Sequence, residues 1–420
     1  MHRRVLLVSL LFALLAACGG PSAGQQTPYV VLVGIDGFRY DYAELHGAPN
    51  LDAIAQNGVR ARAMPPVFPS QTFPSTYAIA TGLLPEHNGI VGNAFFDRAT
   101  DTSWIMSDPE TGGQAKWYGG TPIWTLAEQQ GVRTATVFWP ATDLPIQGTL
   151  PSDYLAFDGS VSSEDRVKQA LDWLAKPEAE RPRFITLMLS DVDQAGHRFG
   201  PETPETRAAV ETVDGVVGTL REGIAASGLP VNLIVVSDHG MIAIDDTVEL
   251  GKKSEFEDMV VWPDGGPFVM LYGDPEPVDQ AYAVLKSREA ADAAARDGKP
   301  RFEVYRKQEI PERLRYRDNE RIGDILVMAN TSVGLSVPGE GEERNSPRAA
   351  THGFDVDQVP EMQAIFYAEG PNFPQGVQIE PFESIDIYPA MAALLGLQLP
   401  EQGVDGSLET LMPVLRNLPQ

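Results

Sequence analysis

The sequence is poor in cysteine, in histidine and in positive charge. One cysteine and six histidines occur among 420 residues, so an intrachain disulfide is excluded. Lys and Arg number 32 against 58 Asp and Glu, which gives a formal net charge of −26. This charge opposes binding to DNA or RNA and to membranes through basic patches, but a small anionic substrate stays compatible if local cations offset the field. The composition, 43% hydrophobic and 21% charged, is typical of a globular chain.

The N-terminal segment has the features of an export signal. Arg3 and Arg4 precede an almost wholly apolar run over residues 5–17, which is short for a transmembrane helix. The run ends in Leu15-Ala16-Ala17-Cys18, which resembles the lipobox of bacterial lipoproteins. We predict a signal peptide over residues 1–17, a tether over 18–28, and a periplasmic or surface lipoprotein of the cell envelope that contacts the membrane only through a lipidated Cys18. The alternative is an ordinary cleaved signal followed by an incidental cysteine.

The rest of the chain alternates between short apolar runs and amphipathic helical segments. The runs predicted as strands are Tyr29–Ile35, Thr134–Trp139, Phe184–Leu189, Asn232–Val236 and Ala364–Tyr367. Helical periodicity covers Ser163–Leu174 and Thr206–Ala226. Continuous apolar runs suit strands buried on both faces, so we predict an α/β fold with a mainly parallel sheet and helices on both faces. A stretch at about 250–350 reads as a smaller inserted α+β subdomain within one catalytic domain over 29–420.

Acidic and histidine residues gather where the predicted strands end. Ligands in open α/β sheets bind beyond the carboxyl ends of strands, and carboxylate with imidazole is a donor set that suits zinc. An aspartate at a strand end is, taken alone, more often a turn or cap residue. The combination is stronger, because several such positions recur along the chain. They are Asp36, Asp193 with His197 four residues later, Asp238 with the adjacent His239, and His352 before a further strand.

A hydroxyl nucleophile is expected at Thr72. The segment Ser75–Gly82 reads as the first turns of a helix, with Pro74 near its start. Thr72 then lies close to a helix N-terminus, where free N–H groups and the helix dipole favour an alkoxide and a bound phosphoryl group. The alternative for the segment alone is that Thr72 is only an N-cap.

In their order along the chain, these motifs resemble the nucleotide pyrophosphatase/phosphodiesterase family of the alkaline phosphatase superfamily. The matching blocks are Val33–Arg39, Gln71–Pro74, Thr81–Leu83, Pro85–Ile90, Asn93, Phe138–Pro140, Asp193, Gly196–His197, Gly200–Pro201, Ser237–Met241 and His352–Asp355. The resemblance implies an alkaline-phosphatase-like fold. The family pattern Glu-Glu-Pro before the metal-binding Asp at position 193 is replaced here by Ser190-Asp191-Val192, a departure that bears on specificity more than on catalysis.

The resemblance also implies roles for individual residues and two Zn²⁺ per chain. Asp193, His197 and His352 would hold one ion, and Asp36, Asp238 and His239 the other, with Thr72 as a further ligand and as nucleophile. Asn93 would bind a phosphoryl oxygen. Phe73 matches the aromatic residue after the nucleophile, and Phe157 falls where the family often has a Tyr that stacks on the base. The two rings could enclose a base; the alternative is that one or both belong to the core. His46 and His87 have no metal role in this scheme and are expected to be structural.

The implied activity is zinc-dependent hydrolysis of phosphodiester or pyrophosphate bonds of nucleotides through a covalent phosphothreonine-type intermediate, which releases nucleoside monophosphates. One alternative is a phosphomonoesterase or a phospholipid-directed phosphodiesterase of the same superfamily. A second alternative is a surface lipoprotein that binds zinc or a solute without catalysis. The absence of Arg around Thr72 favours diesters, because a monoester carries one more negative charge to neutralise.

Overall fold

The computed structural model describes residues 28–263, 266–339 and 349–419. The predicted signal peptide, the lipidated Cys18 and the tether up to residue 27 lie outside these ranges and stay predictions. Within the described residues, no helix combines the length and apolar character needed to cross a membrane.

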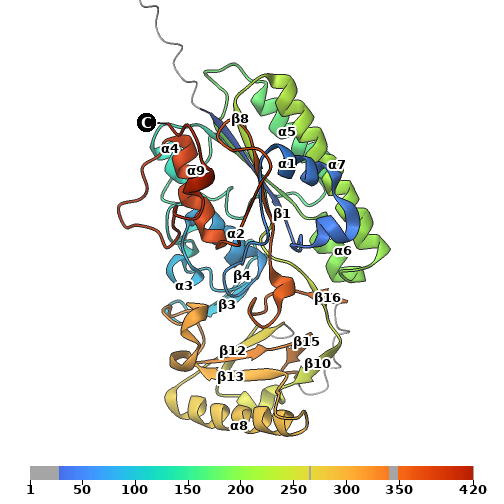
Figure 1. The fold of residues 1–420 in the computed structure, drawn as a ribbon. Coiled ribbons are helices and arrows are strands. Elements are labelled where there is room, and N and C mark those ends of the chain that lie inside the picture. The colour runs from blue at the N-terminus through green and yellow to red at the C-terminus, as the bar shows by residue number, and fades with distance from the viewer. Residues whose placement is uncertain (1–27, 264–265, 340–348, 420) are drawn as a thin grey trace, which may run out of the picture.

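A mixed sheet of eight strands forms the centre of the molecule (Figure 1), in the order β18-β2-β17-β8-β1-β7-β5-β6. The strands are β1 (Tyr29–Ile35), β2 (Val59–Ala61), β5 (Thr134–Val137), β6 (Asp153–Leu155), β7 (Phe184–Leu189), β8 (Val231–Val236), β17 (Phe366–Glu369) and β18 (Val377–Ile379). β1 pairs in parallel with β7 on one side and with β8 on the other. Of the described strands in this sheet only β17 runs against its neighbours, so the predicted mainly parallel sheet is confirmed.

Two predicted strands differ from those observed, for local reasons. The strand expected over Thr134–Trp139 stops at Val137, because Phe138 adopts a left-handed conformation with a φ of 59°. The strand expected at Ala364–Tyr367 begins at Phe366 and is antiparallel to β8. Its residues are buried up to the last one, and an apolar run buried on both faces carries no information about strand direction.

Helices cover both faces of the central sheet, and the pleat of β1 shows why. Val30 and Leu32 point into one apolar core, whereas Val31 and Val33 point into the other. The first core is covered by α2 (Thr72–Thr81), α4 (Ile123–Gln129) and α9 (Ile387–Leu395), and the second by α1 (Pro49–Asn57), α5 (Ser163–Leu174) and α7 (Pro204–Ser227) (Figure 1). The predicted helix Ser163–Leu174 matches α5.

The predicted α+β insertion is a second, antiparallel sheet with a helix on one face. Its strands are β11 (Val260–Trp262), β12 (Phe268–Tyr272), β13 (Phe302–Arg306) and β14 (Ile325–Ala329), in the order β11-β12-β14-β13, and its helix is α8 (Pro275–Ala294). Val269 and Leu271 face the core that α8 covers. Phe268 and Met270, on the opposite face, join the core of the main sheet. The insertion is therefore packed onto the main domain by one face of its sheet.

Shorter elements lie in the segments that connect the longer strands and helices. They are α3 (Pro85–Asn88), β3 (Ala94–Asp97), β4 (Thr102–Ile105), α6 (Asp191–Phe199), β9 (Ile242–Ala243), β10 (Asp246–Glu249), β15 (Val333–Ser336) and β16 (Ala350–Thr351). β9 pairs antiparallel with β16, so that Ile242 lies opposite Thr351. This pairing brings together two segments more than 100 residues apart, one following His239 and one leading to His352. His352 follows a strand, whereas the sequence suggested that it comes just before one.

A buried aspartate joins two helices on one face of the sheet. Asp214, in α7, has 2% of its surface exposed. Its carboxylate accepts hydrogen bonds from the N–H groups of Asn50 (3.0 Å) and Leu51 (2.9 Å), and from Asn50 Nδ2 (2.9 Å). Both N–H groups belong to the first turn of α1, which lacks a side-chain cap of its own. Asp214 therefore caps α1 from a neighbouring helix.

We predict that Asp214→Ala lowers the free energy of unfolding by about 2–3 kcal/mol, because it leaves helix N–H groups buried without an acceptor. Urea unfolding followed by circular dichroism measures the change. Glu211→Ala is the control, since Glu211 lies on the same helix and is exposed; it should change stability by less than about 0.5 kcal/mol. Equal effects of the two substitutions would contradict the capping role.

Candidate active site

The candidate catalytic residues meet at the carboxyl edge of the three central strands. Asp36 directly follows β1 and Asp238 lies just after β8. Asp193 lies in the first turn of α6, which follows β7, and not at the strand end itself. Because β8, β1 and β7 are adjacent and parallel, their carboxyl ends meet at one edge. The topology thus brings together three aspartates spread over about 200 residues.

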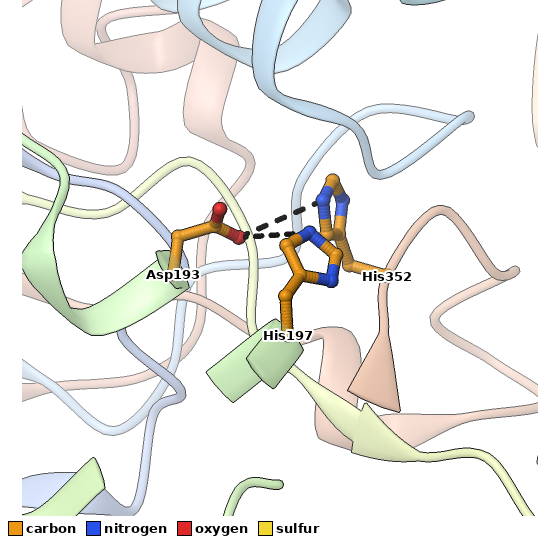
Figure 2. Close-up of side chains that lie close together, drawn as sticks. All are labelled: Asp193, His197 and His352. Atoms are coloured by element: carbon orange, nitrogen blue, oxygen red, sulfur yellow. Dashed lines mark ion pairs between the residues drawn. The ribbon is translucent and has the colours of Figure 1, made fainter. Parts of the chain in front are cut away.

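The first group consists of Asp193, His197 and His352 (Figure 2). Helix α6 places Asp193 and His197 one turn apart on the same face, with Asp193 Oδ1 3.4 Å from His197 Nε2. His352, from the far end of the sequence, places its Nε2 3.7 Å from the same carboxylate oxygen. Figure 2 shows both imidazoles directed toward the Asp193 carboxylate.

The second group consists of Asp36, Asp238 and His239, which are all buried. His239 Nε2 lies 3.4 Å from Asp36 Oδ1 and 3.4 Å from Asp238 Oδ2. The rings of His239 and His352 stack at a centroid distance of 3.6 Å, so the two groups adjoin each other. The six residues that the sequence predicts as ligands therefore form two neighbouring sets of three.

The spacing of these atoms fits two tetrahedral metal sites. Zinc binds nitrogen and oxygen ligands at ~2.0–2.2 Å, which puts two ligand atoms of a tetrahedron ~3.3–3.6 Å apart. The carboxylate–imidazole distances of 3.4, 3.7, 3.4 and 3.4 Å are close to that range. Asp36 Oδ1 and Asp238 Oδ2 are also buried without a hydrogen-bond partner among the residues that the structure describes. Such oxygen atoms have the character of metal ligands.

Main-chain carbonyls orient all three histidines. His197 Nδ1 lies 2.8 Å from Ala350 O, and His239 Nδ1 lies 2.9 Å from Gly240 O. His352 Nδ1 lies 3.1 Å from Ser70 O. A carbonyl oxygen only accepts, so each Nδ1 carries the hydrogen, and a neutral ring then presents the bare lone pair of Nε2 to the carboxylates. Lone pairs that face carboxylate oxygens repel them unless a cation lies between.

Burial perturbs the ionisation of this cluster strongly. Burial, with the charges of Asp238 and Asp193 next, raises the pKa of Asp36 well above its ordinary value. Burial and the charge of Asp193 raise the pKa of Asp238 to about 8, although the N–H of Gly37 donates to it (3.1 Å). Burial lowers the pKa of His239 to about 3, so this ring is neutral at pH 7. Divalent cations would offset the charge that the fold concentrates here.

Thr72 is the first residue of α2 and adjoins the second group. Its Oγ1 lies 3.2 Å from His239 Nε2, which is both a hydrogen-bond distance and a separation that two ligands of one zinc ion adopt. The helix begins three residues earlier than Ser75, and Gln71 is its N-cap. Thr72 thus belongs to the helix and does not cap it, and the dipole of α2 is directed at the hydroxyl.

Asn93 lies beside the start of α2. Its Oδ1 accepts a hydrogen bond from the main-chain N–H of Phe73 at 2.9 Å. Pro74 has no N–H, so the N–H donors in the first turn are few and one of them is already used. The Asn93 side chain is therefore joined to the first turn of α2 directly after Thr72.

The two predicted base-contacting aromatic residues differ in their surroundings. Phe73 is partly buried and makes an edge contact with Trp104 at a ring-centroid distance of 5.8 Å. Phe157 is 72% exposed, and its ring makes an edge contact with Phe138 at 5.5 Å. Arg166 lies over the ring of Phe138 at 4.8 Å. Among the described residues, the rings of Phe73 and Phe157 make no contact with each other. Phe157 is thus a solvent-facing ring that packs against Phe138.

The residues outside this scheme have other partners. His46 Nε2 lies 3.0 Å from Pro201 O, and His87 Nδ1 lies 2.7 Å from Asp405 Oδ2. Neither histidine belongs to the ligand groups found among the described residues. In the divergent segment before Asp193, the carboxylate of Asp191 accepts a hydrogen bond from the hydroxyl of Ser163 at the start of α5. This contact joins α6 to α5 rather than contributing a ligand.

Sequence reasoning did not identify the groups that orient the site. The carbonyls of Ser70, Gly240 and Ala350 fix the three imidazoles, and a main-chain atom leaves no mark in residue type. Gln71 was noted only as part of a motif, although its side chain contacts the main chain of Asn93. A Gln directly before the predicted nucleophile is the one signal in the sequence that could have indicated this role.

Comparison with known proteins identifies the family of this chain. The family model for type I phosphodiesterases and nucleotide pyrophosphatases matches residues 30–355. The chain is 34% identical over 399 residues to human ectonucleotide pyrophosphatase/phosphodiesterase family member 1, covering 93% of the chain and 42% of that protein. It is 35% identical over 404 residues to a venom phosphodiesterase of Macrovipera lebetinus, covering 93% of the chain and 46% of that protein. The chain thus spans less than half the length of these two relatives.

Solved structures show the same fold. Murine ectonucleotide pyrophosphatase/phosphodiesterase 5, solved as an inactive variant in complex with AMP, superposes with a TM-score of 0.83 at 29% sequence identity. The match covers 93% of the chain and 100% of that structure. The human counterpart superposes with a TM-score of 0.82 at 27% identity, again over 93% of the chain and 100% of that structure. By sequence and by fold, the chain belongs to the type I phosphodiesterase/nucleotide pyrophosphatase family.

Proposed function

We propose that the protein hydrolyses phosphodiester or pyrophosphate bonds of nucleotides, with zinc, through a covalent intermediate on Thr72, and releases nucleoside monophosphates. The observation that carries this proposal is the position of Thr72 Oγ1, 3.2 Å from His239 Nε2 at the edge of two adjoining ligand sets. AMP in the inactive variant of the murine relative supports a nucleotide ligand for this fold.

The donor set supports two zinc ions in defined places. Asp193, His197 and His352 would hold one ion. Asp36, Asp238 and His239 would hold the other, with Thr72 Oγ1 beside it. Bound in this way, zinc lowers the pKa of a coordinated hydroxyl and stabilises negative charge on the attacking and leaving oxygens.

The residues of the chain set up the attack on phosphorus. Thr72 is the first residue of α2, so its Oγ1 lies beside His239, where the helix dipole favours a negatively charged oxygen. Thr72 attacks phosphorus in line with the leaving oxygen, and the phosphoryl group is transferred to its Oγ1. Water then displaces Thr72 in a second step. Asn93 Nδ2, left available because Oδ1 is bound to Phe73 N–H, donates to a nonbridging oxygen and stabilises its charge.

The competing functions are less compatible with these features. A phosphomonoesterase must neutralise an additional charge, yet the segment Pro69–Tyr77 around the nucleophile contains no Arg or Lys. A phospholipid-directed enzyme needs apolar walls for acyl chains, whereas Phe157 is an exposed ring on a polar loop. A binding protein has no need of a hydroxyl placed beside the metals. These features favour nucleotide diesters.

The purified protein should contain about two zinc ions per chain, because the six ligands form two sets. Elemental analysis of the purified protein measures the content. His352→Ala should lower it to about one, since the second set stays complete, and should remove activity on a chromogenic nucleotide diester. His87→Ala, a histidine outside both sets, is the matched control and should keep both metal and activity. An active wild-type enzyme with one metal ion or none would contradict the two-site assignment.

Thr72→Ala should reduce turnover by at least about 10³-fold while zinc content stays near that of the wild type, because the nucleophile is lost and the six ligands remain. Thr72→Ser, which keeps a hydroxyl, should retain part of the activity. Rapid quenching of the wild type with a labelled diester should trap the phosphoryl group on Thr72. Substantial activity in the Ala variant would mean that water attacks phosphorus directly, and the covalent intermediate would be wrong.

Phe157→Ala should lower kcat/KM for nucleotide diesters about 10- to 100-fold, since base stacking is worth ~1–3 kcal/mol. Phe73→Ala should do the same and also lower stability, because Phe73 packs against Trp104. Hydrolysis of a simple aryl diester without a base should change much less. Tyr154→Ala is the control for Phe157→Ala, because Tyr154 is also an exposed aromatic residue and lies nearby on β6. It should affect the hydrolysis of neither substrate. Equal losses on both substrates would mean that the rings support the fold or the metal sites.

A further inference from the structure

Two side-chain amides form a reciprocal link around the nucleophile. Gln71 Oε1 accepts a hydrogen bond from the main-chain N–H of Asn93 at 2.9 Å. Asn93 Oδ1 in turn accepts one from the main-chain N–H of Phe73, also at 2.9 Å. The residues on either side of Thr72 are thus each joined to Asn93, one through its side chain and one through its main chain. The two hydrogen bonds and the chain from Gln71 to Phe73 form a closed loop through Asn93, and Thr72 is part of that loop.

The chemistry of the two contacts fixes the orientation of both amides. A main-chain N–H only donates, so the oxygen of each side-chain amide, and not its nitrogen, must face that group. With Oδ1 held against Phe73 N–H, Nδ2 of Asn93 is directed away from it and stays available as a donor. Gln71 holds the main chain from which this side chain extends. The direction of the Nδ2 donor therefore depends on Gln71 as well as on Asn93 itself.

Gln71 is held firmly enough to act as such a support. Its exposed fraction is 9%, and although it is the N-cap of α2 its side chain makes no capping hydrogen bond to that helix. The loop that carries His352 packs against it: a Cβ atom on Gly353, which has a φ of 113°, would lie 3.1 Å from Gln71 Cγ. The preceding residue, Ser70, donates its hydroxyl to Phe354 O (2.7 Å).

We propose that Gln71 is a positioning residue that acts through Asn93. Its side-chain carbonyl holds the Asn93 main chain so that Nδ2 is aimed at the nonbridging phosphoryl oxygen next to Thr72. This inference rests on the proposed role of Asn93 as phosphoryl ligand. Gln71 itself touches no substrate atom in this scheme, and its contribution vanishes when the Asn93 amide is absent.

A double-mutant cycle on the zinc-loaded protein tests this dependence. Gln71→Met keeps the length of the side chain and removes the acceptor, and it should lower kcat for a nucleotide diester about 10-fold. Asn93→Ala should lower kcat about 100-fold, as loss of an oxyanion donor does. The double variant should be no slower than Asn93→Ala alone. Affinity for orthovanadate, measured on the same variants, should show the same pattern without any turnover.

Gln147→Met is the matched control, because the Gln147 side chain also hydrogen-bonds the main chain, donating through Nε2 to Gly120 O, but lies outside the site; it should leave kcat and vanadate affinity unchanged. Multiplicative losses in the double variant would overturn the inference, since Gln71 would then act independently of Asn93. Wild-type kcat retained in Gln71→Met would overturn it too. If the wild type cleaves no diester but the vanadate cycle is non-additive, the positioning role stands and the proposed function falls.

Discussion

The architecture of this protein depends on one electrostatic constraint, the placement of two buried carboxylates and one partly buried carboxylate next to three imidazoles whose Nε2 atoms face them. Without cations this arrangement is repulsive, and the raised pKa of Asp36 and Asp238 reflects that cost. Two divalent ions would make the net charge of the cluster positive, because they bring four positive charges against the three negative charges of the carboxylates. A chain with a formal net charge of −26 would then present a local positive field to an anionic phosphate. The field needed for such a substrate would come from metal, not from Lys or Arg.

The rest of the fold holds that cluster in place. Parallel pairing of β8, β1 and β7 brings three aspartates to one edge, and the short β9–β16 pair carries His352 across to them. Three main-chain carbonyls then fix the rings with Nδ1 protonated. One of these carbonyls belongs to Ser70, two residues before Thr72, so the orientation of a ligand and the position of the nucleophile are set by the same segment. A shift in this segment would disturb both.

The outer part of the site is built differently. Phe157 faces solvent, and its ring makes an edge contact with Phe138, which directly follows β5 in a left-handed conformation. A non-glycine residue with positive φ is uncommon and is retained where the surroundings demand it. Here the ring of Phe138 contacts both Arg166 and Phe157. The exposed ring is therefore anchored to the body of the domain, while its free face remains open to a ligand.

The sequence by itself determined the chemistry: apolar runs placed β1 and β7, and helical periodicity placed α5, at their observed bounds. The Asp and His residues that it predicted as ligands are those that the fold assembles. Element bounds and ligand types could be predicted because each depends on residues close together in the sequence. The direction of β17, the start of α2 at Thr72 and the capping of α1 by Asp214 were decided by tertiary structure. So were the carbonyl partners of the histidines and the link from Gln71 to Asn93. Each of these depends on hydrogen bonds between segments far apart in sequence, often to main-chain atoms, and residue type does not encode such partners.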